Sequence, residues 1–297
     1  MIGCPEGFAA YWQRVDEDLA CQEALPVLEH ARRHSSSSFD VYFVRFTSIG
    51  PYRVFAVLSI PAGDGPFPGL LELPRYGSVN NFPHWNDRLR YVVLTVMHRG
   101  QRLADQPYAA AYPGLLTDGI EQPGDYVLRG VVADCLRGAE ILLGRPEVDP
   151  KRVALRGNDL AVIAAARRGG FSVVHLESTL LYRAAEARLL SDDYPLEELN
   201  DYLRSTPRAE AALEGTLSLF DPLHHGAAVR APTLVSVGDD GGLAGRPWLD
   251  PLLDSFGGTV EEYRLTHRGG VDADQVDAIL AHRLGSEPKT RFQAFVN

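Results

Sequence analysis

The chain has 297 residues, enough for one large α/β domain or two smaller ones. Hydrophobic residues make up 45% and charged residues 23%, a balance that predicts a large buried core and excludes extensive disorder. The formal net charge is -10 and no basic cluster stands out. Because nucleic-acid binding requires a basic surface, the composition argues against a nucleic-acid partner.

Three widely spaced cysteines, Cys4, Cys21 and Cys135, predict free thiols in a reducing compartment. Their spacing is unsuited to zinc, and we expect neither a metal nor another cofactor. The beginning of the chain lacks the pattern of a signal peptide, and no run of about 18 apolar residues could span a membrane. We therefore expect a cytoplasmic protein without a membrane partner.

The first third of the chain predicts a helix followed by strands. Apolar residues from Phe8 to Leu19 recur at steps of three and four and predict an amphipathic helix over residues 5–34, which the serines at 35–38 end. Alternating segments at 40–47 and 52–60 predict an antiparallel hairpin at a sheet edge. Apolar strands are then expected at 69–73 and 91–97, the second buried on both faces.

The rest of the chain alternates between helices and strands. The expected elements are a helix at 126–143, strands at 171–176, 232–237 and 259–265, and a closing helix at 272–284. A polar, helical stretch at about 180–225 predicts a small cap of short helices. This alternation predicts a doubly wound, mostly parallel sheet with helices on both faces, in a single domain over residues 1–297.

The segment Arg152 to Ala166 reads as strand, tight turn and helix. This is the layout of a nucleophile elbow, in which a strained turn lifts one side chain above the sheet beside a helix N-terminus. The usual elbow is G-x-S-x-G. Here Asp159 takes the place of the serine and Ala161 that of the second glycine.

Several segments in the same order resemble the acetyl xylan esterase and cephalosporin C deacetylase family, carbohydrate esterase family seven of the α/β-hydrolases. They include Phe8-Ala-Ala-Tyr-Trp12, GPFPGLLELPRYG at 65–77, His98-Arg-Gly-Gln101, Pro146-Glu-Val-Asp-Pro150 and Leu217-Ser-Leu-Phe-Asp-Pro222. The resemblance covers nearly the whole chain. It implies an α/β-hydrolase fold and, as for that family's members, a homo-oligomer.

The family's catalytic positions map onto a changed set of residues. Its serine falls on Asp159, and the glutamine after it on Leu160, whose backbone N–H could still serve an oxyanion hole. The family's other oxyanion donor, the tyrosine N–H of its His-Gly-Tyr motif, falls on Tyr76, with Arg75 in place of the glycine. The histidine falls on His267. The acid aligns with Gly241, so that Asp240 or Asp239, just before it, would orient His267.

A carboxylate at the elbow is a poor nucleophile toward an acyl carbonyl, so we expect negligible acetylesterase activity. One hypothesis makes Asp159 a nucleophile toward saturated carbon, with His267 as base and Asp240 as its partner. Another makes Asp159 and His267 a general base for a small-molecule substrate, a biosynthetic intermediate for example, with Arg75 pairing Asp159 or binding the substrate. The alternatives are a binding protein without catalysis, in which Asp159 only caps its helix, and a residual ester hydrolase.

Overall fold

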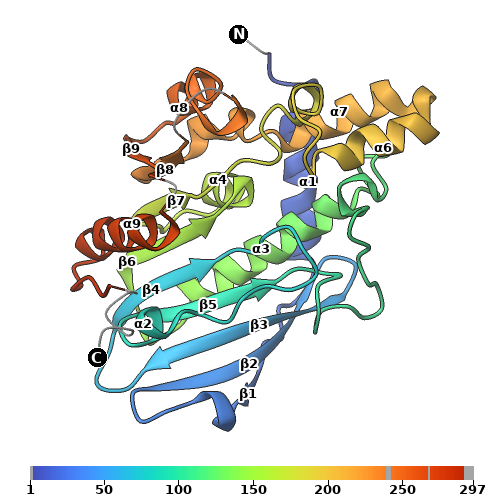
Figure 1. The fold of residues 1–297 in the computed structure, drawn as a ribbon. Coiled ribbons are helices and arrows are strands. Elements are labelled where there is room, and N and C mark those ends of the chain that lie inside the picture. Colours follow the sequence, from blue (N-terminus) through green and yellow to red (C-terminus); the bar gives the residue numbers. More distant parts are fainter. Residues whose placement is uncertain (1–2, 239–241, 267, 291–297) are drawn as a thin grey trace.

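The computed structural model describes residues 3–238, 242–266 and 268–290. One sheet of nine strands, in the order β1-β2-β3-β5-β4-β6-β7-β8-β9, forms its centre (Figure 1). The strands are β1 (Val27–His30), β2 (Phe39–Ser48), β3 (Tyr52–Pro61), β4 (Phe67–Glu72), β5 (Val92–Met97), β6 (Val148–Gly157), β7 (Val173–Leu176), β8 (Thr233–Val237) and β9 (Val260–Arg264). The first three strands are antiparallel, and β4 to β9 pair in parallel.

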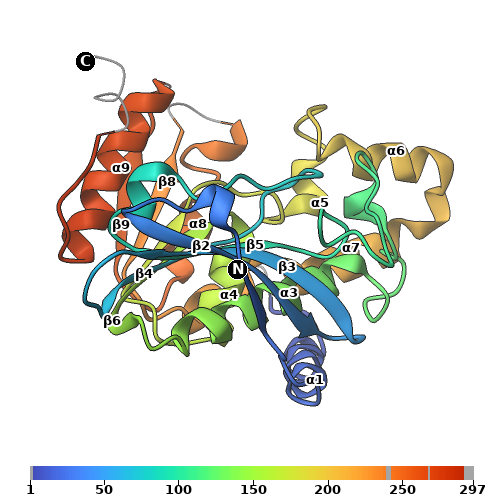
Figure 2. The same cartoon turned by 90° about the horizontal axis from the view of Figure 1, so that it is seen from below.

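Helices cover both faces of this sheet. They are α1 (Phe8–Ala20), α2 (Trp85–Arg88), α3 (Val127–Leu143), α4 (Asp159–Arg167), α5 (Ala184–Ala187), α6 (Glu197–Ser205), α7 (Glu210–Phe220), α8 (Asp250–Ser255) and α9 (Gly269–Arg283). Figure 2 shows α9 on one face and α1, α3 and α4 on the other. The strands between these two layers are apolar, and every residue of β5 and β8 is buried. This arrangement confirms the predicted mostly parallel, doubly wound sheet.

The predicted N-terminal helix over residues 5–34 is wrong in its second half, because α1 ends at Ala20. Leu25 has a positive φ of 41°, and the following Pro26 has no N–H to continue a helix. The chain then forms β1, which pairs with β2. The predicted hairpin of β2 and β3 is confirmed, but β1 and not β2 forms this edge of the sheet.

The expected cap lies between β7 and β8 and consists of α5, α6 and α7. It contacts the loop between β5 and α3 through the carboxylate of Glu198 on α6, which accepts the N–H of Leu116 at 3.0 Å. The cap is therefore attached to that loop. No helix in the described part of the chain is both long and apolar enough to cross a bilayer.

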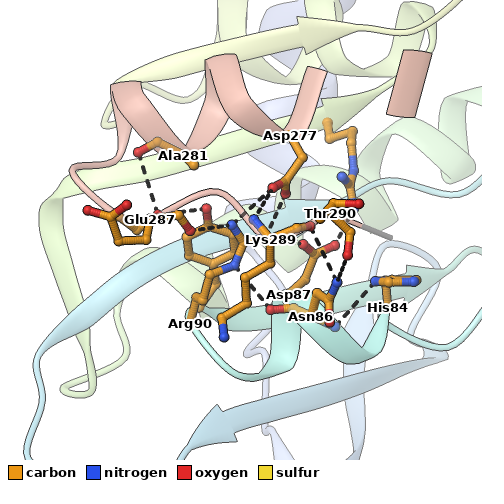
Figure 3. A network of polar contacts seen from close by, with 12 residues as sticks. His84, Asn86, Asp87, Arg90, Asp277, Ala281, Glu287, Lys289 and Thr290 are labelled. Carbon is orange, nitrogen blue, oxygen red and sulfur yellow. Dashed lines mark hydrogen bonds and ion pairs between the residues drawn. The ribbon is translucent and has the colours of Figure 1, made fainter. Parts of the chain in front are cut away.

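The end of the described chain is fastened to α2 through a buried ionic network (Figure 3). The Arg90 guanidinium binds the carboxylates of Asp87 (3.0 Å) and of Asp277 on α9 (2.5 Å). The side-chain amide of Asn86 donates to the carbonyl oxygens of Lys289 and Thr290 at 3.3 and 3.0 Å. These contacts hold α9 and the residues after it against the sheet.

Candidate functional site

The turn between β6 and α4 is a relaxed, capped turn. Asn158 occupies the N-cap position with φ −83° and ψ −152°, and its Oδ1 accepts the N–H of Leu160 at 3.1 Å. The non-glycine residues with positive φ in the described chain lie elsewhere, at Leu25, Leu103 and Arg183. The expectation of a strained nucleophile elbow is therefore wrong. A residue that caps a helix needs only an extended backbone, which Asn158 adopts at no steric cost.

Asp159 begins α4 and its side chain is fully buried. One carboxylate oxygen accepts the N–H groups of Leu180 (2.5 Å) and Leu181 (2.9 Å), and the other accepts the N–H of Tyr182 (3.2 Å). Burial raises the pKa of this carboxyl to about 6, while the backbone N–H groups act in the opposite direction. The carboxylate thus anchors the beginning of the cap loop to the first turn of α4.

Arg75 binds Glu177 and not Asp159. Its Nη2 donates to both carboxylate oxygens of Glu177 at 3.1 Å. Arg75 follows β4 and Glu177 follows β7, and these two strands flank β6 on either side. The ion pair therefore joins the loops that follow the two strands on either side of β6. The Gln101 amide holds this loop by donating to the carbonyl of Arg75 at 3.0 Å.

Leu160 and Tyr76 are the two residues expected to form an oxyanion hole. Leu160 is buried, and the Oδ1 of Asn158 occupies its backbone N–H, so this donor is not available to a substrate oxygen without a change in the cap. Tyr76 is half-buried, and its ring lies edge-on to Tyr112 with 5.3 Å between ring centroids. Its hydroxyl is buried and makes no hydrogen bond within the described residues. Asp240 and His267, as well as Asp239, lie outside the described residues.

A cavity of about 890 Å³ opens beside this turn. Its lining includes the expected residues Arg75 and Tyr76, together with Asn158 and Glu177. Asp159 is not among the lining residues, because its carboxylate faces the cap loop. On the other side of the turn, a cavity of about 30 Å³ lies between Tyr76, Leu160 and their neighbours, about the room that one water molecule needs.

The large cavity extends under α9, where its lining is polar in a way that the sequence did not lead us to expect. Glu72, Arg156, His175 and Ser236 all line it. Each lies at or near the carboxyl end of its strand, directly after an apolar stretch, which is the available sequence signal. Among the described residues, no group of three metal-ligating side chains is present.

This topology defines the α/β-hydrolase fold. The chain belongs to the acetyl xylan esterase (AXE1) family, whose model matches residues 3–243.

Solved structures agree with this assignment at the level of the fold. Acetyl xylan esterase from Paenibacillus sp. R4 superimposes with a TM-score of 0.81 and 19% identity, covering 97% of this chain and 96% of its own. Acetyl xylan esterase 1 from Thermoanaerobacterium sp. JW/SL YS485 gives 0.78 and 20%, covering 94% and 95%. The acylaminoacyl peptidase of Pyrococcus horikoshii gives 0.60 and 15%, covering 87% and 44%.

Proposed function

We propose that this protein is a member of the acetyl xylan esterase family that binds a small molecule in the large cavity and performs no covalent catalysis at the elbow. The observation that carries the proposal is the state of Asp159. Its carboxylate is fully buried and accepts three backbone N–H groups from the loop after β7. A nucleophile must instead reach the reacting atom of the substrate at about 3–3.5 Å.

Two neighbouring features support the loss of ester chemistry. The N–H of Leu160, which would stabilise an oxyanion, is held by the side chain of Asn158. The Arg75–Glu177 ion pair joins the loops after β4 and β7, on either side of β6, and engages Arg75 with Glu177. Removing one oxyanion donor alone costs about 10²- to 10³-fold in rate in a serine hydrolase, and here the serine is absent as well.

The cavity supports the binding part of the proposal. Its volume of about 890 Å³ lies within the range of small-molecule sites, about 300–1,000 Å³. Its walls combine polar groups with apolar ones such as Leu73 and Val276. The hypothesis of an enzyme that uses Asp159 and His267 would instead require Asp159 to leave its three N–H partners.

Covalent trapping tests this proposal. In a hydrolase with an aspartate nucleophile, removing the histidine base leaves the ester intermediate intact, because no water is activated to cleave it. We would incubate the His267→Ala variant with an epoxide and with a bromoalkane and measure the intact mass. Asp159→Asn in the same background is the matched control. We expect no adduct, and an adduct that maps to Asp159 would establish the enzyme hypothesis instead.

A further inference from the structure

A row of polar side chains forms the floor of the large cavity. On the face of the sheet that α9 covers, one apolar residue from each of five strands belongs to a hydrophobic cluster with α9. These residues are Leu70, Val93, Ala154, Val173 and Leu234. Two residues further along each strand, the next side chain on the same face is polar. These five side chains, which we call the polar row, are Glu72, Thr95, Arg156, His175 and Ser236, and all of them line the cavity.

Three side chains of the polar row, Glu72, Thr95 and Arg156, have hydrogen-bonding or ionic partners within the protein. The Thr95 hydroxyl donates to the Glu72 carboxylate at 2.6 Å. The Arg156 guanidinium binds Glu72 and also the carboxylate of Asp87, at 3.1 Å for the second pair. Asp87 belongs in turn to the network that holds α9 (Figure 3). These groups therefore have partners without any ligand.

The other two residues of the row, His175 and Ser236, have unused hydrogen-bonding capacity. The two side chains are buried, and the Nε2 of His175 lies 3.0 Å from the Oγ of Ser236. The Nδ1 of His175 has no partner within the described residues. Burial lowers the pKa of this imidazole to about 4, so it is neutral at neutral pH.

The His175–Ser236 pair carries more hydrogen-bond donors than the bond between the two side chains can use. A neutral imidazole carries one N–H and the serine one O–H, and the bond between them uses only one of the two. With the imidazole proton on Nδ1, the serine hydroxyl donates to Nε2 and the Nδ1–H is free. With the proton on Nε2, the serine hydroxyl is free. In either tautomer one buried donor lacks an acceptor, which is unfavourable unless a ligand or water brings one.

The charges of the cavity define the ligand further. Among the described lining residues, the carboxylates of Glu72, Glu177 and Asp272 outnumber the guanidiniums of Arg75 and Arg156. An anionic ligand is therefore disfavoured. Each of these carboxylates already has a partner: Glu72 binds Arg156, Glu177 binds Arg75, and Asp272 accepts the hydroxyl of a tyrosine at 2.8 Å. A cationic ligand would therefore find no unpaired carboxylate among them.

We propose that the cavity binds an uncharged carbonyl compound, whose oxygen accepts a hydrogen bond from the His175–Ser236 pair. Its apolar part lies against Phe82 and Val276, which line the same cavity. This inference rests on the proposed function, because it names the ligand class of the same cavity. It does not depend on the state of Asp159.

Three probes with the same ring and different head groups test the inference. We would titrate the full-length protein, labelled with ¹³C in its histidine rings, with cyclohexanone, cyclohexylammonium and cyclohexanecarboxylate. The His175→Gln variant identifies the His175 signals. We expect cyclohexanone to bind and to shift them, and both charged probes to bind at least about fivefold more weakly. Loss of one hydrogen bond in Ser236→Ala should weaken cyclohexanone binding by about fivefold.

Ser59→Ala is the matched control, since Ser59 is a buried serine of β3 that does not line the cavity. This variant should bind cyclohexanone like the wild type. The inference is overturned if a charged probe binds as tightly, if bound cyclohexanone leaves the His175 signals unchanged, or if no probe binds. These outcomes are independent of the trapping experiment, in which an Asp159 adduct would defeat the proposed function alone.

Discussion

Replacing Asp159 by alanine should destabilise the fold, because its carboxylate accepts the N–H groups of Leu180, Leu181 and Tyr182. A buried N–H without an acceptor costs about 1–3 kcal/mol. Three such groups give an expected loss of about 3 kcal/mol or more in the free energy of unfolding, measured by urea denaturation. Asn158→Ala, which removes only the helix cap, should cost about 1 kcal/mol and serves as the control.

The free energy of unfolding lost in Asp159→Ala should also depend on pH in a defined direction. The pKa of Asp159 in the folded protein is raised from 3.8 to about 6. A raised pKa means that the folded wild type holds the carboxyl proton more tightly than the unfolded chain, which adds to its folding stability at low pH. The wild type loses this contribution as the pH rises through 6. The difference in unfolding free energy between wild type and Asp159→Ala should therefore narrow by about 1 kcal/mol from pH 5 to pH 6, and by less than about 0.5 kcal/mol from pH 6 to pH 7.

An Asp159→Ala variant that loses less than about 1 kcal/mol would refute the structural role. So would a difference that widens as the pH rises, because it would indicate a carboxylate stabilised by a nearby cation.

Three further predictions concern the surroundings of the site. The pKa of His175 is lowered from 6.5 to about 4, so the free energy of unfolding of the wild type should fall by about 2–3 kcal/mol more than that of His175→Gln between pH 6.5 and pH 4.5. Equal decreases in the two proteins, measured by urea denaturation, would contradict the burial of His175. Arg75→Ala should cost at most about 1 kcal/mol, since 63% of this side chain is exposed, and a loss above about 2 kcal/mol would contradict a role confined to joining the two loops. Arg90→Met should lower the free energy of unfolding by about 3–5 kcal/mol, because it leaves Asp87 and Asp277 buried without their cation. An unchanged free energy of unfolding together with an unchanged rate of proteolysis of the C-terminal residues would disprove this role of Arg90.

Much of the fold could be predicted from the sequence because the signals are local. The apolar strands at 91–97 and 232–237 and the helix at 126–143 lie within one or two residues of β5, β8 and α3. The N-terminal helix was predicted too long because it was extended past Pro26, although its apolar periodicity ends at Leu19 and proline disfavours a helix interior.

The site could be predicted only in position, since its geometry depends on residues far apart in the chain. The strand, turn and helix around Asp159 were evident from the sequence. The direction of its carboxylate depends on a loop that follows 21 to 23 residues later. The polar row likewise depends on strand register, because β6 and β7 place Arg156 beside His175. No local pattern contains this information.

The central claim is that the elbow of this family member has lost its ester chemistry. The most direct measurement is the rate of p-nitrophenyl acetate hydrolysis by the wild type and by His267→Ala, at equal concentrations of folded protein. We expect the same slow rate for both proteins, because Asp159 binds the cap loop and the N–H of Leu160 binds Asn158. A wild-type rate about 100-fold or more above that of the variant, the size of a general-base contribution, would contradict it.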